Sequence, residues 1–404
     1  MKKKKMKIVD GICGIGKTTA IINMIKEDKS DTKYIFITPF LSEVQRIKKS
    51  CPEHKFKEPL MDKRNTKSDD LKHLLKKGEN IVSTHALFKR MWLNEIDLKM
   101  LNNYVLIMDE VFDVSEDIYI TPDDLNLLLG NYIIENEDGF LEWIEPNYNG
   151  VFNNYKLLID GGNVFIHRSQ DGEPLTLIWF FPTELFSSFK DVYVLTYIFG
   201  GQVQKYYYDL FGFEYENFYV KDFHLTSEKQ TYDMSIKSKI KICNIRNLNK
   251  IGDDVFALSE SWFQKGDIKT LKNNTYSFIR YYANVKSSDV LWTTFKKYKN
   301  KVKGKGYSKS FAPLNMRATN EYKEKIAVAY IANRYFSPFL QNFFRAKGVS
   351  VNQDLFALSE LVQFLFRSRI RDGKEIFVYI PSSRMRNAFI WCLHFPERTG
   401  YHAQ

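Results

Sequence analysis

The stretch Gly11-Ile-Cys-Gly-Ile-Gly-Lys17-Thr18 decides how the rest of the chain is interpreted. It fits the pattern G-x-x-x-x-G-K-[ST] at every fixed position. Glycines let a backbone wrap closely around a phosphate with its N–H groups turned inward, and a following helix adds the positive end of its dipole. The apolar pair Ile8-Val9 precedes the loop, and a helix is expected from Lys17 to about Lys26. The stretch therefore predicts a phosphate-binding loop between a strand and a helix.

Each residue type in this loop has an expected task. Lys17 would reach the β- and γ-phosphates of a nucleotide, and the Thr18 hydroxyl would bind Mg²⁺. The expected cofactors are therefore ATP and Mg²⁺. The residues expected to contact the nucleotide run without a gap: Gly11, Ile12, Cys13, Gly14, Ile15, Gly16, Lys17, Thr18 and Thr19. The alternative is a glycine turn without a ligand, which the strand and helix on either side disfavour.

A second motif ends a buried strand. Tyr104-Val-Leu-Ile-Met-Asp109-Glu110 places two acids at the carboxyl end of the strand, where open α/β sheets bind ligands. Asp109 would hold Mg²⁺ through a water molecule, and Glu110 would orient or deprotonate the attacking water. By itself an acid pair after a strand is usually a solvated strand end. The loop upstream reverses that preference and favours a catalytic pair.

Apolar runs and helical stretches alternate through the first part of the chain. The β-branched and aromatic run at residues 34–38 predicts a buried strand that Pro39 stops, and a helix is expected at residues 41–50. Further strands are expected at residues 80–83, 104–108 and 191–196. This alternation predicts right-handed crossovers and a parallel sheet.

The alternation is interrupted at about residues 117–184. Asp138-Gly139 and Asp171-Gly172 are strong turn signals between short apolar stretches, so we expect an inserted, hairpin-rich subdomain. It contains no motif that assigns it a task, and a replication or recombination partner could bind it.

A second alternating region starts near Lys239. Strands are expected at residues 240–245, 289–293 and 375–380, and helices at residues 321–333 and 359–369. The predicted fold class is therefore α/β, with two parallel-sheet domains in tandem. The first would span residues 1–235 and carry the insertion, and the second would span residues 236–404.

Composition bounds the partners and the compartment. The chain of 404 residues has a formal net charge of +11, which fits a polyanionic partner such as nucleic acid, although solubility alone could also account for it. The four cysteines form no CxxC pair and indicate neither zinc nor a disulfide framework. No apolar run approaches the ~20 residues that span a bilayer, so we expect a cytoplasmic protein without a membrane partner.

In this order the motifs resemble those of a superfamily 2 helicase of the DExx type, from a phage or mobile element. The glycine loop resembles motif I, and Asp109-Glu110-Val-Phe resembles motif II. In the first domain, motif Ia is resembled by Phe36-Ile-Thr38-Pro39, the segment before motif II by Val82-Ser-Thr84-His85, and motif III by Val194-Leu-Thr196-Tyr-Ile. In the second domain, motif IV is resembled by Val290-Leu-Trp-Thr293-Thr294-Phe, motif V by Arg317-Ala-Thr319-Asn320, and motif VI by Gln363-Phe-Leu-Phe-Arg367-Ser-Arg369-Ile-Arg371. The resemblance covers most of the chain and implies two RecA-like domains with ATP in the cleft between them.

The resemblance also implies a catalytic arginine. In the family an arginine of motif VI faces the γ-phosphate, and Arg367 or Arg371 would take that place, although Phe366 stands where the family has a glycine. Independently, their i, i+4 spacing would put both arginines on one face of a helix, from which a guanidinium could stabilise transition-state charge. The alternative is that they form surface ion pairs.

Nucleic acid would run across both domains. Short hydroxyl side chains and N–H groups at strand ends suit phosphate contacts that do not read sequence, and otherwise they would cap helices or turns. The candidates are Thr38, Pro39, Thr84, His85, Thr293, Thr294, Arg317, Thr319 and Asn320. Arg384 and Arg386 after the last strand are further candidates for phosphate contact. We expect DNA rather than RNA, in the host cytoplasm if a phage encodes the chain.

The expected function is thus an ATP-dependent helicase or translocase on nucleic acid. Two alternatives stay open: a P-loop kinase for a small molecule such as a nucleotide, and a DNA-packaging or remodelling ATPase that is not a helicase. A kinase would typically need one such domain, and Asp109-Glu110 fits it poorly. A packaging motor normally carries a nuclease domain with clustered acids, and the C-terminal half shows no such cluster in its sequence.

Overall fold

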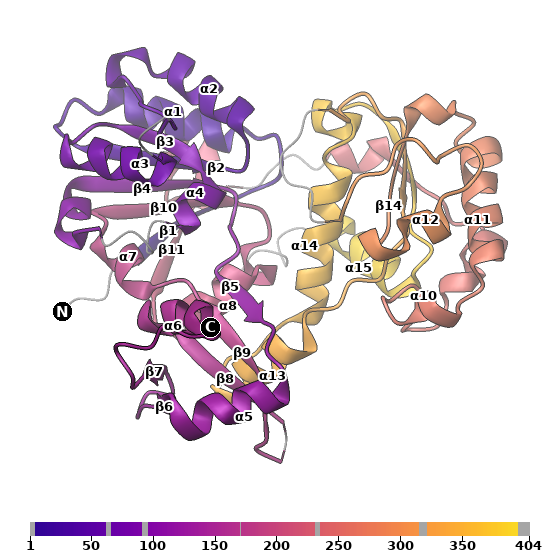
Figure 1. The fold of residues 1–404 in the computed structure, drawn as a ribbon. Coiled ribbons are helices and arrows are strands. Elements are labelled where there is room, and N and C mark those ends of the chain that lie inside the picture. Colours follow the sequence, from indigo (N-terminus) through magenta and orange to yellow (C-terminus); the bar gives the residue numbers. More distant parts are fainter. Residues whose placement is uncertain are drawn as a thin grey trace.

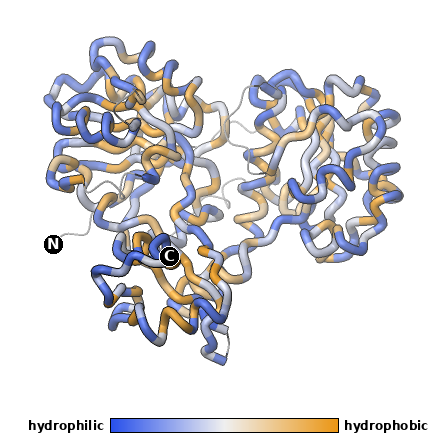
Figure 2. The backbone as a smooth tube through the Cα atoms, in the orientation of Figure 1, coloured by the Kyte–Doolittle hydropathy of each residue, from blue (hydrophilic) through white to orange (hydrophobic). Residues whose placement is uncertain are grey.

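The computed structural model describes residues 5–61, 66–90, 96–169, 171–230, 235–314 and 321–394. Two sheets of parallel strands form the cores of two lobes, and a group of antiparallel strands and helices lies below the first lobe (Figure 1). Apolar residues concentrate along the central strands, whereas the outer faces of the surrounding helices are mostly hydrophilic (Figure 2). Among the described residues, no helix is both long enough and apolar enough to cross a membrane.

The larger sheet belongs to the first lobe. Within the described residues it has seven strands in the order β12-β11-β1-β10-β4-β2-β3, and neighbours are parallel except for β11 and β12. The strands are β1 (Lys5–Asp10), β2 (Lys33–Thr38), β3 (Ile81–Thr84), β4 (Tyr104–Asp109), β10 (Asp191–Thr196), β11 (Glu214–Lys221) and β12 (His224–Thr226). All four strands predicted after the loop, at residues 34–38, 80–83, 104–108 and 191–196, are confirmed.

Helices cover both faces of this sheet. They are α1 (Lys17–Glu27), α2 (Leu41–Ser50), α3 (Lys67–Lys76), α4 (His85–Lys89), α7 (Thr183–Ser188) and α8 (Val203–Leu210). Alternate residues of β4 point to opposite faces, because side chains along a strand alternate. Val105 and Ile107 share a core with α1 and α2, and Leu106 and Met108 share the core on the other face. Burial on both faces explains why the strand reads as an unbroken apolar run.

The insertion mixes hairpins and helices. Its elements are β5 (Ser115–Ile118), α5 (Pro122–Asn131), β6 (Ile133–Glu135), β7 (Leu141–Trp143), α6 (Asn153–Asp160), β8 (Val164–Arg168) and β9 (Pro174–Phe180). Both predicted turns close antiparallel pairs, β6 with β7 and β8 with β9. Gly139 and Gly172 each have a φ of 86° there, which glycine adopts without a steric penalty. The hairpins are confirmed, and α5 and α6 are additions that were not expected.

The smaller sheet belongs to the second lobe. In the described part of that lobe four parallel strands follow the order β13-β16-β15-β14. The strands are β13 (Ile240–Ile242), β14 (Val290–Thr293), β15 (Ala327–Tyr330) and β16 (Ile376–Tyr379). The helices around it are α9 (Arg246–Asn249), α10 (Trp262–Lys265), α11 (Ile268–Ser277), α12 (Lys299–Val302), α13 (Pro338–Ala346), α14 (Gln353–Leu365) and α15 (Ser383–His394).

The helix predicted at residues 321–333 is wrong. The strand β15 occupies part of this segment, pairs with β14 on one side and β16 on the other, and is buried throughout. Alanines favour a helix in isolation, but a central strand of a parallel sheet is covered on both faces. Burial therefore overrides the local preference.

The helix predicted at residues 359–369 is displaced. Helix α14 begins earlier and ends at Leu365, and Arg369–Asp372 form a separate 3₁₀ helix, η10. Ser368 separates them in an extended conformation with φ −82° and ψ −178°. Arg367 and Arg371 thus do not share one helix face, and the expectation from their i, i+4 spacing is wrong. The extended backbone at Ser368 instead determines how the two arginines lie relative to each other.

Among the described residues the lobes touch at several places, which include a shared hydrophobic core and a contact of α13 with the insertion. Ile12, Tyr197 and Ile198 of the first lobe share a hydrophobic core with α14 and α15. Helix α13 extends from the second lobe onto the insertion (Figure 1), where the Phe343 and Phe165 ring centroids are 5.3 Å apart. The chain division at residues 235 and 236 stays a prediction.

We expect Gly201→Ala to weaken the first of these contacts. A Cβ on Gly201 would lie 2.3 Å from the carbonyl oxygen of Leu355 in α14, so the two lobes would have to separate slightly. Such overpacking costs about 1–3 kcal/mol, measurable as a lower free energy of unfolding in urea. Gly130→Ala is the matched control, because nothing lies within 4 Å of a Cβ at this position in α5. The control should leave stability equal or slightly higher, and an equal loss in both variants would contradict the assignment.

Candidate nucleotide-binding site

The loop between β1 and α1 has the backbone geometry of a phosphate cradle. Gly14 and Gly16 have φ of 94° and 90°, a region that residues with a Cβ rarely adopt. The Gly11 amide donates to the Thr196 carbonyl over 3.2 Å, which ties the loop to the end of β10. A Cβ on Gly16 would lie 2.6 Å from the ring of Phe223. Both backbone conformation and space therefore require glycine at position 16.

The structure brings the two predicted motifs together. The Thr18 hydroxyl donates to a carboxylate oxygen of Asp109 over 3.1 Å. The Lys17 ammonium donates to the carbonyl oxygens of Gly11 (2.5 Å) and Ile12 (3.2 Å). Sheet order explains the meeting, because β1 and β4 both pair with β10 and parallel strands end at the same edge.

Glu110 follows in an uncommon conformation. Its φ is 76°, and residues with a Cβ seldom adopt this region. Its N–H donates to the Leu195 carbonyl over 2.9 Å, so the neighbouring strand holds the backbone in place. Strain of this kind costs about 1–3 kcal/mol and is found where the surroundings enforce it, often at functional sites.

Burial makes the Asp109 carboxyl a poor acid. It raises the pKa of this group to about 7, and the negative charges of Glu110 and Glu43 act in the same direction. The hydrogen bond from Thr18 and the charge of Lys17 oppose the shift without cancelling it. A low-dielectric site disfavours an unpaired carboxylate, and a cation at this position would compensate the charge.

Asp10 is a member of the site that the sequence analysis missed. Its carboxylate accepts hydrogen bonds from the N–H groups of Ile198 (2.8 Å) and Phe199 (2.9 Å). Ile198 has a φ of 55°, an outlier for a β-branched residue, so Asp10 stabilises a strained turn after β10. Burial raises the pKa of Asp10 to about 6, although the two amide hydrogen bonds and the positive charge of Lys17 act to lower it. The sequence did contain a signal for this role, because Asp10 ends an apolar strand and a carboxylate that becomes buried there has to be paired.

A cavity of about 300 Å³ lies between the lobes at this edge. On the first-lobe side it is lined by the loop and by α2 and β4 residues: Cys13, Gly14, Gly16, Lys17, Thr18, Thr19, Glu43, Arg46, Asp109 and Glu110. On the second-lobe side it is lined by residues at and after the end of α14: Gln363, Phe366, Arg367, Arg371 and Asp372. Both predicted arginines therefore lie at the cavity, and Arg369 instead donates to the Glu375 carbonyl.

The second-lobe wall contains hydrogen-bond donors without acceptors. Arg367 is only 8% exposed, and its Nη1 has no hydrogen-bond partner within the described ranges. The same holds, in this described part of the chain, for the amide nitrogen of Gln363. Burial lowers the pKa of Arg367 to about 10, which still leaves it charged at neutral pH. Buried donors of this kind cost free energy, and an anion in the cavity would satisfy them.

Thr18 and Asp109 suit Mg²⁺. This ion prefers oxygen ligands, keeps several waters, and takes other ligands from substrate phosphates. The described residues contain no group of three or more His, Cys, Asp or Glu that could hold a metal alone. The chain's own oxygens therefore fit a metal that is shared with a nucleotide's phosphates.

A larger cavity of about 820 Å³ adjoins the first one. Glu110, Gln363 and Arg367 line both cavities and form the partition between them. Aromatic rings from both lobes line the larger cavity, among them Phe112, Phe256, Phe295, Tyr335, Phe339 and Phe356. A molecule in the larger cavity would therefore touch the three side chains of the partition, which a nucleotide in the smaller cavity would also touch.

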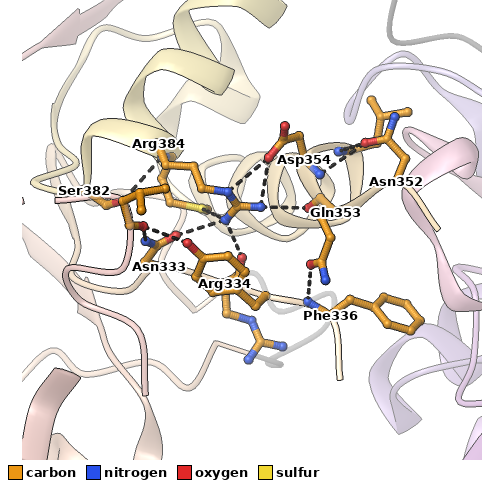
Figure 3. Close-up of polar contacts among 12 residues, drawn as sticks. Asn333, Arg334, Phe336, Asn352, Gln353, Asp354, Ser382 and Arg384 are labelled. Atoms are coloured by element: carbon orange, nitrogen blue, oxygen red, sulfur yellow. Dashed lines mark hydrogen bonds and ion pairs between the residues drawn. The ribbon is translucent and has the colours of Figure 1, made fainter. Parts of the chain in front are cut away.

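Arg384 fixes the second-lobe wall of the larger cavity (Figure 3). Its guanidinium binds partners from two segments: the side chain of Asn333 (3.0 Å) with the carbonyl of Arg334 (2.7 Å), and the carbonyl of Gln353 (3.1 Å) with the carboxylate of Asp354 (2.9 Å). Arg386 donates to the carbonyls of Ile380 (2.8 Å) and Pro381 (2.9 Å). Both guanidinium groups thus organise the protein's own backbone, and the geometry gives no support to phosphate contact by either.

The first-lobe candidates for nucleic-acid contact lie at neighbouring strand ends. Thr38 and Thr84 are register partners at the ends of β2 and β3. The Thr84 hydroxyl accepts from the Leu87 N–H over 3.4 Å and caps α4. The His85 ring lies edge-on to Phe112, with ring centroids 6.1 Å apart. Pro39, directly after β2, is half-buried.

Two of the second-lobe candidates are inaccessible to solvent. Thr293 and Thr294 at the end of β14 are fully buried, and their hydroxyls have no hydrogen-bond partner in the described structure. Arg317, Thr319 and Asn320 lie outside the described residues. The assignment of all these residues to nucleic-acid contact stays a prediction.

Comparison with known sequences finds two matching family models and a close relative. Residues 234–392 match the model of the YonV C-terminal Rossmann-like domain, and residues 115–179 match that of the YonV middle domain. The SPbeta prophage-derived protein YonV of Bacillus subtilis strain 168 is 42% identical to this chain over 407 residues. The match covers 95% of this chain and 97% of that protein.

Comparison with solved structures finds similar folds at low sequence identity. An apo structure of XPD has a TM-score of 0.50 at 12% identity, with 93% of this chain and 92% of that chain covered. Xpd4 of S. tokodaii has a TM-score of 0.47 at 12% identity, with 96% and 93% covered. The first likeness shows the fold, a tandem of two RecA-like parallel-sheet domains, and confirms the predicted α/β fold class.

We expect Asp10→Ala to destabilise the site measurably. The N–H groups of Ile198 and Phe199 are buried and would lose their acceptor, which costs about 1–3 kcal/mol. Urea unfolding measures the change, and Asp31→Ala, at an exposed position, is the control that should stay within about 0.5 kcal/mol of the parent. Equal stability of Asp10→Ala and the parent would contradict the role given to this carboxylate.

Proposed function

The chain belongs to the YonV family, and from the geometry of the cavity between its lobes we propose that it is an ATP-hydrolysing motor acting on nucleic acid. In finer terms, we assign it to the DExx type of superfamily 2 helicases or translocases, with RecA-like domains at residues 1–235 and 236–404. Its relative is described as prophage-derived, which supports a phage or mobile-element origin.

One observation supports this proposal above the others. The glycine loop and two carboxylates on the first lobe face a pair of arginines on the second lobe across a cavity of about 300 Å³. An ATPase needs on one side a cradle and a metal site, and on the other a cation that senses the γ-phosphate. Placing these parts on different lobes lets nucleotide state control how the lobes are arranged.

Each side chain would contribute a defined step. The loop amides and Lys17 bind the phosphates, and Thr18 with Asp109 holds Mg²⁺, which would neutralise charge that develops on the phosphate oxygens. Glu110 orients the attacking water and accepts its proton. Arg367 or Arg371 stabilises the charge of the transferred group from the opposite lobe.

The larger cavity would couple nucleic acid to this chemistry. Its partition of Glu110, Gln363 and Arg367 is shared with the nucleotide site, so a strand bound near it would alter the groups that act on ATP. The predicted phosphate contacts at Thr38, Pro39, Thr84 and His85 would position the strand on the first lobe. We assign Thr293, Thr294, Arg317 and Thr319 to the second-lobe part of the path, and favour DNA over RNA.

The insertion and the compartment complete the proposal. The insertion exposes apolar side chains such as Tyr119 (83%) and Val151 (87%), which would suit a replication or recombination partner. The site of action would be the cytoplasm of the host cell.

Stimulation of hydrolysis by nucleic acid tests the proposal. Purified full-length protein is assayed for phosphate release from ATP with and without single-stranded DNA, duplex DNA and RNA. The proposal expects several-fold stimulation by at least one of them, strongest with DNA. Equal rates in all arms would remove the motor function, and transfer of the γ-phosphate to a small acceptor rather than to water would favour a kinase.

Two variants should separate binding from chemistry. Lys17→Ala is expected to abolish tight ATP binding and turnover, because the phosphates lose their main cation. Glu110→Gln should bind ATP as well as the parent but lower turnover by about 10²-fold or more, since the metal ligand survives and the base is lost. Calorimetric binding and phosphate release measure the two effects, and normal turnover in Glu110→Gln would exclude its catalytic role.

The arginines give a third prediction with an internal control. Arg367→Ala should lower turnover by about 10³-fold, the range seen for arginines that stabilise phosphoryl transfer. Arg371→Ala tests the other candidate in the same way. Arg369→Ala is the matched control, because its guanidinium donates to the Glu375 carbonyl and does not line the cavity. A loss confined to Arg369→Ala would contradict the assignment.

A further inference from the structure

We propose that the exposed ring of Phe223 is the stacking platform for the base of the bound nucleotide. Phe223 belongs to none of the motifs, and it forms the tip of the β11–β12 hairpin at the edge of the larger sheet. The inference rests on the proposed function, because it assigns a base-binding residue to the same nucleotide site.

The conformation of this hairpin tip is unusual. Lys221 and His224 are register partners, so Asp222 and Phe223 form a two-residue turn. Both turn residues have positive φ, 50° and 59°, which in such turns strongly favours Asn and Gly. A bulky aromatic residue in this region is a true outlier. Outliers of this kind concentrate at ligand clamps, where the surroundings maintain them.

Two contacts hold the ring at the phosphate cradle. The side-chain amide of Asn23 in α1 donates to the Phe223 carbonyl over 3.0 Å. The edge of the ring contacts Gly16, the last glycine of the loop, so closely that a Cβ there would lie 2.6 Å from it. Even so, 56% of Phe223 is exposed. An aromatic side chain is thus fixed beside the loop with much of its surface open.

Sheet order places this ring on the side where the base should lie. The metal side of the site is Thr18 with Asp109, and β4, which carries Asp109, lies on one side of β1. The β11–β12 hairpin lies on the other side of β1. In a glycine loop of this type the γ-phosphate end of the nucleotide is the end at Lys17 and the metal. The nucleoside therefore extends away from β4, toward the hairpin.

Binding by stacking also limits how strongly the site can select one base over another. Every base has a π-face, so stacking stabilises binding without distinguishing bases strongly. We therefore expect ATP and GTP to bind with similar affinity, and inorganic tripolyphosphate to bind without any contribution from the ring. This difference between nucleotide and tripolyphosphate is the signature of a base contact.

Equilibrium binding to the full-length protein tests the proposal. Affinities for a non-hydrolysable ATP analogue, the GTP analogue and tripolyphosphate, each with Mg²⁺, are measured by calorimetry for the parent and for Phe223→Gly, Phe223→Trp and Asp222→Gly. Phe223→Gly should weaken both analogues about tenfold, leave tripolyphosphate unchanged, and not lower the melting temperature, because glycine suits the positive φ. Phe223→Trp should bind like the parent, and Asp222→Gly, in the same turn, is the matched control.

The outcomes separate this inference from the proposed function. If Phe223→Gly binds the ATP analogue as tightly as the parent while Lys17→Ala does not bind it, the nucleotide site stands and the platform is refuted. If Phe223→Gly weakens tripolyphosphate equally, the ring only supports the loop, and the platform is again refuted. If the parent binds none of the three ligands, the proposed function fails, and the platform fails with it.

Discussion

The parallel register of β1, β10 and β4 is the constraint on which the site depends. Asp10 pairs with Thr196 at the end of β1 and β10, and Asp109 pairs with Leu195 across β10 and β4. Only this alignment lets the Thr18 hydroxyl reach Asp109 over 3.1 Å. Because side chains alternate along a strand, a slip of one residue would turn the carboxylates to the opposite face. Core packing on both faces of the sheet thus determines the chemistry at its edge.

Burial between the lobes gives the site its electrostatic character. The same exclusion of water raises the pKa of Asp109 and lowers that of Arg367, so both charges are disfavoured when they are alone. A bound anion and its metal would compensate both at once. The interaction of nucleotide with protein would therefore be strongest when the lobes are close, since interactions between charges strengthen as water leaves. This links the occupancy of the cavity to the relative position of the lobes.

Three strained turns lie at the same edge of the larger sheet. The backbone has a positive φ at Glu110, Ile198 and Phe223, and a hydrogen bond holds each of these conformations. The Glu110 N–H donates to the Leu195 carbonyl, and the Ile198 N–H donates to the Asp10 carboxylate. The Phe223 carbonyl accepts from the Asn23 side chain. None of these conformations would persist without such partners. The surrounding strands, which are regular and buried, supply the rigidity that the strained turns require.

The sequence by itself determined the local features whose signals lie in neighbouring residues: the glycine loop, the acid pair after a buried strand, and the hairpin turns at Gly139 and Gly172. Only the tertiary structure decided what depends on distant neighbours. It turned an alanine-rich stretch into the central strand β15, because burial outweighs intrinsic propensity. It also separated Arg367 from Arg371 by the turn at Ser368 and carried Phe223 to Gly16. Such contacts join residues far apart in the chain, and no local pattern encodes them.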